Sequence, residues 1–573
     1  MIDWARFLSA PNQSGLSVIT TMSLPIKFIA TIPISFLSRF VLMASVAISS
    51  SDGPVRAHIA ILSTTDLHGN IYPIDYNTNQ AEARGLARVA TVVRQARKET
   101  PNLLLLDSGD TIQGTPLTFY HAKVNNTPPD PMMTVMNAMG YDAMAVGNHE
   151  YEFGWDVLNK ARGEARFPWL SANTYRKGTD QTYFEPFTIK QVAGVRIGIL
   201  GLTTPGMPSL DDPDRYYSKI EVREPVSEAR KWVSVLREKE HVDLVIIAMH
   251  MGVEADLRTG ENNPGQMPNE NAALAISRQV PGIDVILMGH THREVPSLYI
   301  NGVLLAQAEK WGHFVARVDL YLEKTDRWHV IAKSSRTIPV GNQIEADPEV
   351  IRSAEPYHRE TQAWLGRVIG QSDADLRAGE ERFRDTAILD LVQRVQLEAG
   401  NADVSMSMSL NSKARIPKGP VTVRDILGLY EYEAAPIVVE VTGKQLKDAL
   451  EHSARHFGEY KPHKPLTELI DERFPSYTYD VAEGITYELD ISKPVGDRIQ
   501  QMCFRGKPVE PAQKLRLATI TFRVNGGAGY TMFKDSRVIW RSNKELRELI
   551  IEWVKRHHNI PITATNNWRL LPL

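Results

Sequence analysis

The chain has 573 residues, of which 43% are hydrophobic and 23% are charged, and its formal net charge is −3. This composition is typical of a globular protein long enough for two or three domains. The near-neutral charge gives no reason to expect a nucleic-acid polymer as a partner. The single cysteine, Cys503, excludes an intrachain disulfide and a zinc cluster built from thiolates.

Residues 1–57 differ in pattern from the rest of the chain. Lys27 precedes the apolar run 28–37, and Ser45-Val46-Ala47 offers the small residues that a signal peptidase requires. We therefore expect an exported protein, periplasmic or extracellular. The alternatives are an uncleaved anchor or a translation start at Met22. No later apolar run reaches the roughly 18 residues of a membrane-spanning helix, so we expect no stable membrane span.

From residue 58 onward, predicted strands and helices alternate. Apolar runs predict strands at 58–63, 103–106, 143–146, 195–200, 244–249 and 285–288, and helical spacing of apolar residues predicts helices over 83–98 and at Met132–Met139. This alternation predicts a layered α/β domain over residues 58–345. In such sheets, ligands bind at the carboxyl ends of the strands.

Polar residues of a few types follow five of these strands. They are Asp66, His68, Asp110, Asn148, His250, His290 and His292. Carboxylate, imidazole and amide oxygen suit zinc, manganese, iron or cobalt. Seven ligands exceed the four of one tetrahedral ion and suffice for two ions that share a carboxylate. Two divalent ions about 3.5–4 Å apart bind a phosphoryl group and lower the pKa of a bridging water, which becomes the nucleophile.

His149, beside Asn148, is left free by this assignment, and it could protonate the leaving oxygen. The alternative is that all these residues only cap strands and turns.

The pattern changes after residue 345. We expect a connecting helix over 346–370 and a second domain over 371–573, with helices at 386–398 and 443–456 and strands at 422–429, 437–441 and 515–524. The polar segment 462–475 is expected to be a surface insertion.

The motifs TTDLHGN, DSGDTIQG, GNHEYEFG, AMHMG and GHTHR are arranged in this order over residues 58–325. In these motifs the chain resembles the calcineurin-like metallophosphoesterases. The resemblance implies a four-layer α/β sandwich and two metal ions. One ion would be held by Asp66, His68, Asp110 and His292, and the other by Asp110, Asn148, His250 and His290.

The second domain resembles that of bacterial 5′-nucleotidases and, more closely, that of 2′,3′-cyclic-nucleotide 2′-phosphodiesterase/3′-nucleotidases. The stretches VTVRDILGLYEYEAAPIVVEVTGKQLKDALEHSA, FPSYTYDVAEGITYELD and NGGAGY carry this resemblance. It implies that Tyr432 and Phe522 sandwich the nucleobase, with Tyr430 as the alternative to Tyr432. Arg415 and Asn525 complete the expected substrate-binding set.

The sequence departs from the family pattern at two informative positions. Glu152 stands where the family often has the Asp that orients the catalytic histidine, and it joins Asn148 and His149 in the expected catalytic set. Asp390 stands where 5′-nucleotidases carry a substrate-binding arginine. A carboxylate there would disfavour a dianionic 5′-phosphate and favour the singly charged cyclic phosphate.

We therefore expect an α/β protein with an N-terminal four-layer sandwich and a separate C-terminal α/β (α+β) substrate domain, joined by a helix. It should be a monomeric two-metal hydrolase of nucleotides, acting on 2′,3′-cyclic nucleotides and 3′-nucleotides in nucleotide catabolism. A 5′-nucleotidase is the main alternative. A thiosulfohydrolase-like enzyme and an inactive nucleotide-binding protein are the others.

Overall fold

The computed structural model describes residues 54–206, 217–256, 258–262, 269–409, 411–430, 434–474 and 476–572. Residues 54–573 form one compact unit, and most of the predicted leader lies outside the described residues. Among the helices of the described ranges, none combines the length and the apolar character that crossing a membrane requires.

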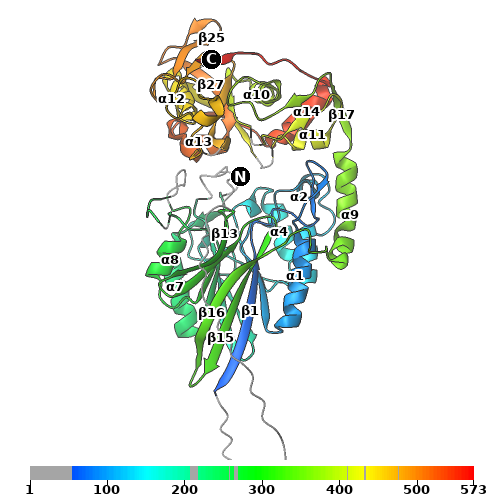
Figure 1. The fold of residues 1–573 in the computed structure, drawn as a ribbon, viewed down its shortest axis with the longest axis vertical. Coiled ribbons are helices and arrows are strands. Elements are labelled where there is room, and N and C mark those ends of the chain that lie inside the picture. The colour runs from blue at the N-terminus through cyan, green and yellow to red at the C-terminus, as the bar shows by residue number, and fades with distance from the viewer. Residues whose placement is uncertain are drawn as a thin grey trace, which may run out of the picture. The chain divides into compact units, whose positions relative to one another are not determined.

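Two six-stranded sheets form the N-terminal part of this unit (Figure 1). The first has the order β16-β15-β1-β4-β5-β6, with β1 (Val55–Thr64), β4 (Leu103–Asp107), β5 (Ala143–Ala145), β6 (Trp169–Leu170), β15 (Phe314–Lys324) and β16 (Trp328–Pro339). Strands β1, β4, β5 and β6 are parallel, and β15 runs antiparallel to its neighbours β1 and β16.

The second sheet has the order β13-β14-β12-β11-β9-β8. Its strands are β8 (Phe187–Val192), β9 (Val195–Thr203), β11 (Leu244–His250), β12 (Val285–Met288), β13 (Glu294–Ile300) and β14 (Val303–Ala308). The four central strands are parallel, and the two edge strands are antiparallel to them. The predicted strands of residues 58–288 are all present in these two sheets.

The two sheets and the helices outside them form four layers, and successive side chains of β1 point alternately to the inner and the outer side of its sheet. Ile59 and Ile61 of β1 pack with Ile197 and Ile246 in a core between the two sheets. Leu62, of opposite parity on β1, packs on the outer side. Helices α1 (Leu86–Glu99) and α3 (Pro131–Met139) cover the first sheet, and α7 (Pro225–Ser234) and α8 (Ala273–Gln279) cover the second. This confirms the expected helix–sheet–sheet–helix sandwich.

Helix α9 (Pro348–Leu365) occupies the predicted connector. Asp347 caps it, because its Oδ1 accepts hydrogen bonds from the backbone N–H groups of Glu349 and Val350. The helix packs against α2 (Pro116–Lys123) and α3.

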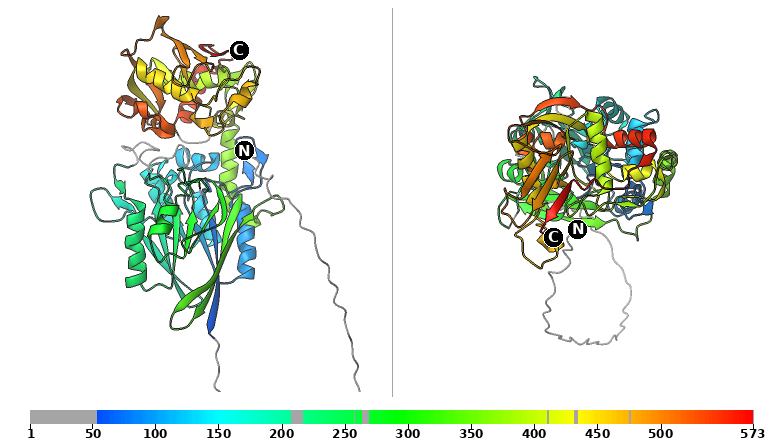
Figure 2. Two further views of the ribbon diagram at one scale, coloured as in Figure 1. Left: turned by 60° about the vertical axis from the view of Figure 1, so that its left-hand side comes forward. Right: turned by 90° about the horizontal axis from the view of Figure 1, so that it is seen from above.

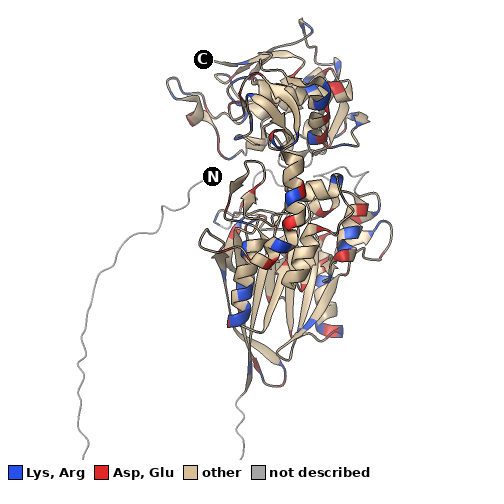
Figure 3. Cartoon of the chain, turned by 90° about the vertical axis from the view of Figure 1, so that its right-hand side faces the viewer, with Lys and Arg blue, Asp and Glu red and all other residues tan. Residues whose placement is uncertain are grey.

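The C-terminal part is built on a five-stranded sheet with the order β23-β19-β27-β22-β28. Its strands are β19 (Val404–Ser407), β22 (Pro436–Thr442), β23 (Val481–Glu483), β27 (Lys514–Ile520) and β28 (Arg537–Arg541). Its longer helices are α10 (Ala387–Gly400), α12 (Gly443–Ala454) and α14 (Leu546–His557), seen from two further sides in Figure 2. A four-stranded sheet, β26-β25-β24-β30, adds β24 (Thr486–Asp490), β25 (Ile499–Phe504), β26 (Lys507–Pro508) and β30 (Trp568–Leu571). Figure 3 shows basic and acidic residues interspersed along the helices and loops of the C-terminal part.

One predicted strand of this part is wrong, and another is shorter than predicted. Residues 422–429 contain the short helix α11 (Val423–Leu427), because Thr422 and Asp425 form a capping box that starts a helix. The predicted strand 515–524 ends at Ile520, and Thr521–Val524 forms the short helix α13. Phe522 therefore lies on a helical turn.

Candidate metal centre

Five of the seven predicted ligands have a left-handed backbone. The φ angles are 50° for Asp66, 45° for His68, 59° for Asp110, 71° for His290 and 53° for His292. Residues other than glycine adopt such angles at a cost, and the strained positions cluster at functional sites. Each of these residues follows a strand of the two sheets, so the strain is concentrated where the strand ends meet.

The side chains of Asp66, His68 and His292 form one group of potential ligands. The Nε2 atom of His292 lies 3.3 Å from Asp66 Oδ1 and 3.1 Å from His68 Nε2. Asp66 is held by the hydroxyl of Thr65, which donates to its Oδ2 at 2.7 Å, and by the backbone N–H of His290.

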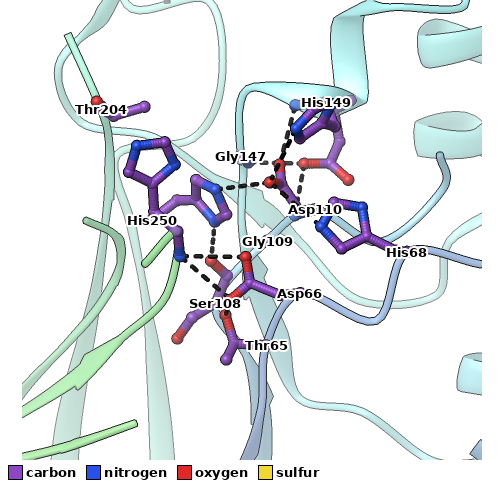
Figure 4. A network of polar contacts seen from close by, with 12 residues as sticks. Thr65, Asp66, His68, Ser108, Gly109, Asp110, Gly147, His149, Thr204 and His250 are labelled. Carbon is purple, nitrogen blue, oxygen red and sulfur yellow. Dashed lines mark hydrogen bonds and ion pairs between the residues drawn. The ribbon is translucent and has the colours of Figure 1, made fainter. Parts of the chain in front are cut away.

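The side chains of Asp110, His250 and His290 form a second group. His250 Nδ1 lies 2.8 Å from the carbonyl oxygen of Ser108, so Nε2 is the nitrogen that faces Asp110, 2.9 Å from its Oδ2 (Figure 4). Asp110 also lies near the first group, with 3.9 Å between its Oδ2 and His68 Nε2.

Three further side chains of the centre fit divalent metal ions. Asn148 Oδ1 is buried, and within the described residues it has no hydrogen-bond partner. Burial lowers the pKa of His68 to about 3, so its Nε2 keeps a lone pair although it faces another imidazole nitrogen. Burial also lowers the pKa of His250, but the charge of Asp110 outweighs it and the pKa rises to about 9. Bound cations would replace the proton that this charge otherwise attracts.

His149 lies at the edge of both groups. Its Nδ1 is 2.5 Å from Glu152 Oε1, and its Nε2 is 3.8 Å from Asp110 Oδ2. Burial lowers the pKa of His149, but the carboxylates of Glu152 and Asp110 raise it more strongly, to about 10. The imidazole is thus held by one carboxylate and directed toward the other.

Two carboxylates that support the centre were not singled out from the sequence. Glu150 is fully buried and accepts hydrogen bonds from the backbone N–H groups of Asp110, Thr111 and Gly147. It fixes the loop that carries Asp110. Gly147 is required there, because a Cβ atom would lie 2.2 Å from Asp110 Oδ1. Glu150 could have been identified from the sequence, because it is the last residue of the GNHE motif.

The second carboxylate that supports the centre is Glu270, whose Oε1 lies 2.8 Å from His290 Nε2. It belongs to a loop that no motif marked.

The expected substrate residues are more scattered. Tyr432 lies outside the described residues. Tyr430 is 1% exposed, and its hydroxyl lies 2.8 Å from that of Ser407, so it is a core residue. Phe522 is half-buried on α13 and packs against Gly527. Asn525 follows α13 and donates its backbone N–H to Thr521.

Arg415 and Asp390 both lie beside other carboxylates of the C-terminal part. The guanidinium of Arg415 is half-exposed and binds both carboxylate oxygens of Asp375. Asp390 is 4% exposed and lies beside Asp385 and Glu483. The carboxylate of Asp390 is therefore too buried to face a substrate phosphate, and it gives no support for a singly charged substrate.

Two family models match the chain. Calcineurin-like phosphoesterase matches residues 59–294, and the C-terminal domain of 5′-nucleotidase matches residues 368–535. The chain is 28% identical over 94% of its length to the trifunctional nucleotide phosphoesterase protein YfkN of Bacillus subtilis, but spans only 41% of that relative. It is 28% identical to the 2′,3′-cyclic-nucleotide 2′-phosphodiesterase/3′-nucleotidase of Salmonella typhimurium, covering 92% of this chain and 91% of the relative.

Solved structures show the same fold. A Staphylococcus aureus protein described as a 5′-nucleotidase superposes with a TM-score of 0.79 and 24% identity, over 90% of this chain and 100% of that one. The 5′-nucleotidase precursor of Thermus thermophilus gives a TM-score of 0.63 at 22% identity, with the same coverage. The chain therefore belongs to the family of metal-dependent phosphoester hydrolases in which a calcineurin-like phosphoesterase domain precedes a 5′-nucleotidase C-terminal domain.

Proposed function

We propose that this protein hydrolyses phosphoester bonds of nucleotides, with 2′,3′-cyclic nucleotides and 3′-nucleotides as its preferred substrates. The observation that carries the proposal is the pair of ligand groups, Asp66–His68–His292 and Asp110–His250–His290, at the strand ends of one sandwich. The full-length similarity to the Salmonella enzyme supports the substrate class. We further propose that the protein is an exported monomer.

We propose that Asp110 is the ligand shared by two divalent ions. Asp66, His68 and His292 would complete one site, and Asn148, His250 and His290 the other. The zinc, manganese, iron or cobalt ions that this donor set suits would supply Lewis-acid stabilisation of the phosphoryl oxygens and a water of lowered pKa. The protein's own part is to fix the ligands, and Glu150 does so for the Asp110 loop through three backbone hydrogen bonds.

His149 is proposed as the general acid. The contact with Glu152 favours the protonated ring by raising the pKa of His149, so Nε2 can donate a proton to the leaving oxygen. Glu152, 2.5 Å from Nδ1, would hold the ring in the orientation that aims Nε2 into the centre.

Phe522 is proposed as one face of the base site, with Tyr432 as the other. The ring of Phe522 is half-buried on a short helical turn, and every nucleobase has a face that can stack on an aromatic ring. Asn525, four residues from the start of α13, and the half-exposed Arg415 are the proposed polar contacts of the substrate.

A substrate panel tests the proposal. The mature protein, reconstituted with Mn²⁺ or Zn²⁺, would be assayed on 2′,3′-cyclic AMP, 3′-AMP and 5′-AMP under identical conditions. We expect the highest kcat/KM on the cyclic or 3′-substrate. Faster hydrolysis of 5′-AMP would establish the 5′-nucleotidase alternative. No hydrolysis of any of the three, with metals bound, would reject the proposal and make a thiosulfohydrolase or a nucleotide-binding protein the next candidates.

A further inference from the structure

Three carboxylates converge in the C-terminal part of the chain, outside the residues that the proposed function uses. Asp385 and Asp390 lie at the start of α10, and Glu483 ends β23. One oxygen from each lies within 4.8 Å of the other two. The segment before β30, with Thr565 and Asn567, closes the cluster.

Around the Thr565 hydroxyl, the cluster has more hydrogen-bond acceptors than donors. The Thr565 hydroxyl lies 3.1 Å from Asp385 Oδ2 and 2.8 Å from Glu483 Oε2, and it has a single hydrogen to donate. The side-chain amide of Asn567 donates to two backbone carbonyls, of Ala482 and Ile485, and so turns its Oδ1 toward the same hydroxyl at 3.4 Å. Three acceptor oxygen atoms thus compete for the single hydrogen of the Thr565 hydroxyl, although Asp385 also accepts hydrogen bonds from the backbone N–H groups of Thr386 and Asn566.

Two buried oxygen atoms at the start of α10 have no hydrogen-bond partner within the described residues. Asp390 is 4% exposed, and its Oδ1 is unpartnered while its Oδ2 accepts from the backbone of Thr565. Thr386, 5% exposed at the N-cap of α10, has an unpartnered Oγ1 that does not cap the helix. A buried acceptor without a donor destabilises the fold, and more so if it is charged.

No Lys or Arg of the described segments forms an ion pair with any of the three carboxylates. Arg394 only lowers the pKa of Glu483 slightly, against the larger effects of burial and of Asp385. Burial, followed by the neighbouring charges of Asp385 and Glu483, raises the pKa of Asp390 to about 7. Repulsion among three carboxylates is relieved most directly by a bound cation.

We propose that Asp385, Asp390 and Glu483, with Thr565 and Asn567, form a structural site for a divalent cation with oxygen ligands only, and that Ca²⁺ is the cation that fits it best. Carboxylate, hydroxyl and amide oxygens are hard ligands, and the cluster has no histidine or cysteine. Ca²⁺ accepts six to eight such oxygens in flexible geometry, whereas Mg²⁺ demands a near-ideal octahedron. The site differs in this from the histidine-rich centre of the sandwich.

Bound Ca²⁺ would link three segments that are distant in sequence. The start of α10, the end of β23 and residues 565–567 would be held by one ion, so the cation stabilises the folded C-terminal part. The site has no part in the proposed chemistry, and its loss should leave the kcat of a folded, metal-loaded enzyme unchanged.

Calorimetry and thermal unfolding of the full-length mature protein test this proposal. After removal of metals with EDTA, CaCl₂ would be titrated into the wild type, Asp390→Asn and the control Asp448→Asn, which changes an exposed carboxylate on α12. We expect one Ca²⁺ per chain and a rise of several degrees in Tm for the wild type and the control. Asp390→Asn should lose both and should melt at a higher temperature than the wild type in EDTA, because it removes one of three repelling charges.

A second variant separates this site from the catalytic centre. Asp110→Ala should keep the Ca²⁺-dependent rise in Tm, since Asp110 belongs to the other cluster. The proposal is overturned if the wild type shows no Ca²⁺-dependent change, if Asp390→Asn retains the full change, or if Asp110→Ala abolishes it. Failure of the nucleotide assays would not affect these results, so the two proposals stand or fall separately.

Discussion

The Nδ1 atom of His149 lies 2.5 Å from Oε1 of Glu152, three residues later in the chain. The contact directs the opposite nitrogen, Nε2, toward Asp110, 3.8 Å away. Glu152 thus occupies the position of an orienting carboxylate, although its side chain is one methylene longer than the Asp that the family often has. The proposed proton donor is held between two carboxylates, and its pKa of about 10 follows from their charges.

Replacing Glu152 with glutamine should lower kcat by about 10- to 100-fold, because the ring of His149 loses its orienting charge. The change also lowers the pKa of His149, so protonated His149 is lost at a lower pH and the alkaline limb of the kcat–pH profile should shift downward. The check is this profile on 2′,3′-cyclic AMP. Glu152→Asp is the matched control and should restore most of the rate. An unchanged profile in Glu152→Gln would show that Glu152 does not orient His149.

Replacing Asp110 with asparagine should reduce kcat/KM by about 10³-fold or more, because this side chain touches both ligand groups. Metal content of the purified variant, measured by mass spectrometry, should also fall below that of the wild type. Asp448→Asn, at an exposed position on α12, is the control and should behave as the wild type. Near-normal activity of Asp110→Asn would contradict the shared-ligand assignment.

His290→Ala and His292→Ala should each lose about one metal ion per chain, but from different sites. The two imidazoles are one residue apart, yet His290 lies with His250 and Asp110 while His292 lies with Asp66 and His68. Anomalous diffraction from crystals of each variant, soaked with zinc, would locate the remaining ion. His329→Ala, an exposed histidine on β16, serves as control. Loss of the same ion in both variants would refute the division into two sites.

The strand ends of the sandwich could be predicted because each buried strand is a short apolar run and each polar ligand follows it directly. Val285–Met288 is a fully buried apolar run, which favours a strand. His290 and His292 follow it with left-handed backbone angles and lie at the metal centre. Long-range contacts had no such signal. Glu270 reaches His290 from a loop, and Asp390 meets Glu483 only after the chain has folded.

The second domain was predicted less accurately because its elements are short. Residues 422–429 have the apolar content of a strand, but the capping box of Thr422 and Asp425 selects a helix. The strand through Ile520 ends early because residues 521–524 turn into α13, in which the backbone N–H of Asn525 donates to the carbonyl oxygen of Thr521. These hydrogen bonds decide the local structure, and they cannot be predicted from the spacing of apolar residues.

Phe522→Ala should raise the KM for 2′,3′-cyclic AMP about tenfold, as expected for the loss of one base–ring stack. The KM for p-nitrophenyl phosphate, which has no nucleobase, should not change by the same factor. Phe504→Ala removes another half-buried ring, on β25, and is the control for general effects on the domain. Equal KM changes for both substrates would argue against a base-stacking role.

His456→Gln should reduce the acid sensitivity of the fold. His456 is 1% exposed, lies 2.6 Å from the Thr478 hydroxyl, and has a pKa lowered to about 4, chiefly by burial. A depressed pKa contributes stability that is present above pH 6.5 and is lost as the pH falls toward 4, on the order of 3 kcal/mol at most. Urea unfolding at pH 7.5 and pH 5 should show a smaller difference in the variant than in the wild type. An equal difference would place the acid sensitivity elsewhere.

Hydrolysis of 2′,3′-cyclic AMP before and after metal removal is the decisive test of whether two metal ions perform the chemistry. The wild-type enzyme would be stripped with a chelator, assayed, and then titrated with Mn²⁺ or Zn²⁺ while bound metal is counted. We expect no activity in the stripped enzyme and full recovery as the second ion per chain binds. Full activity without metal, or recovery complete at one ion per chain, would contradict this expectation.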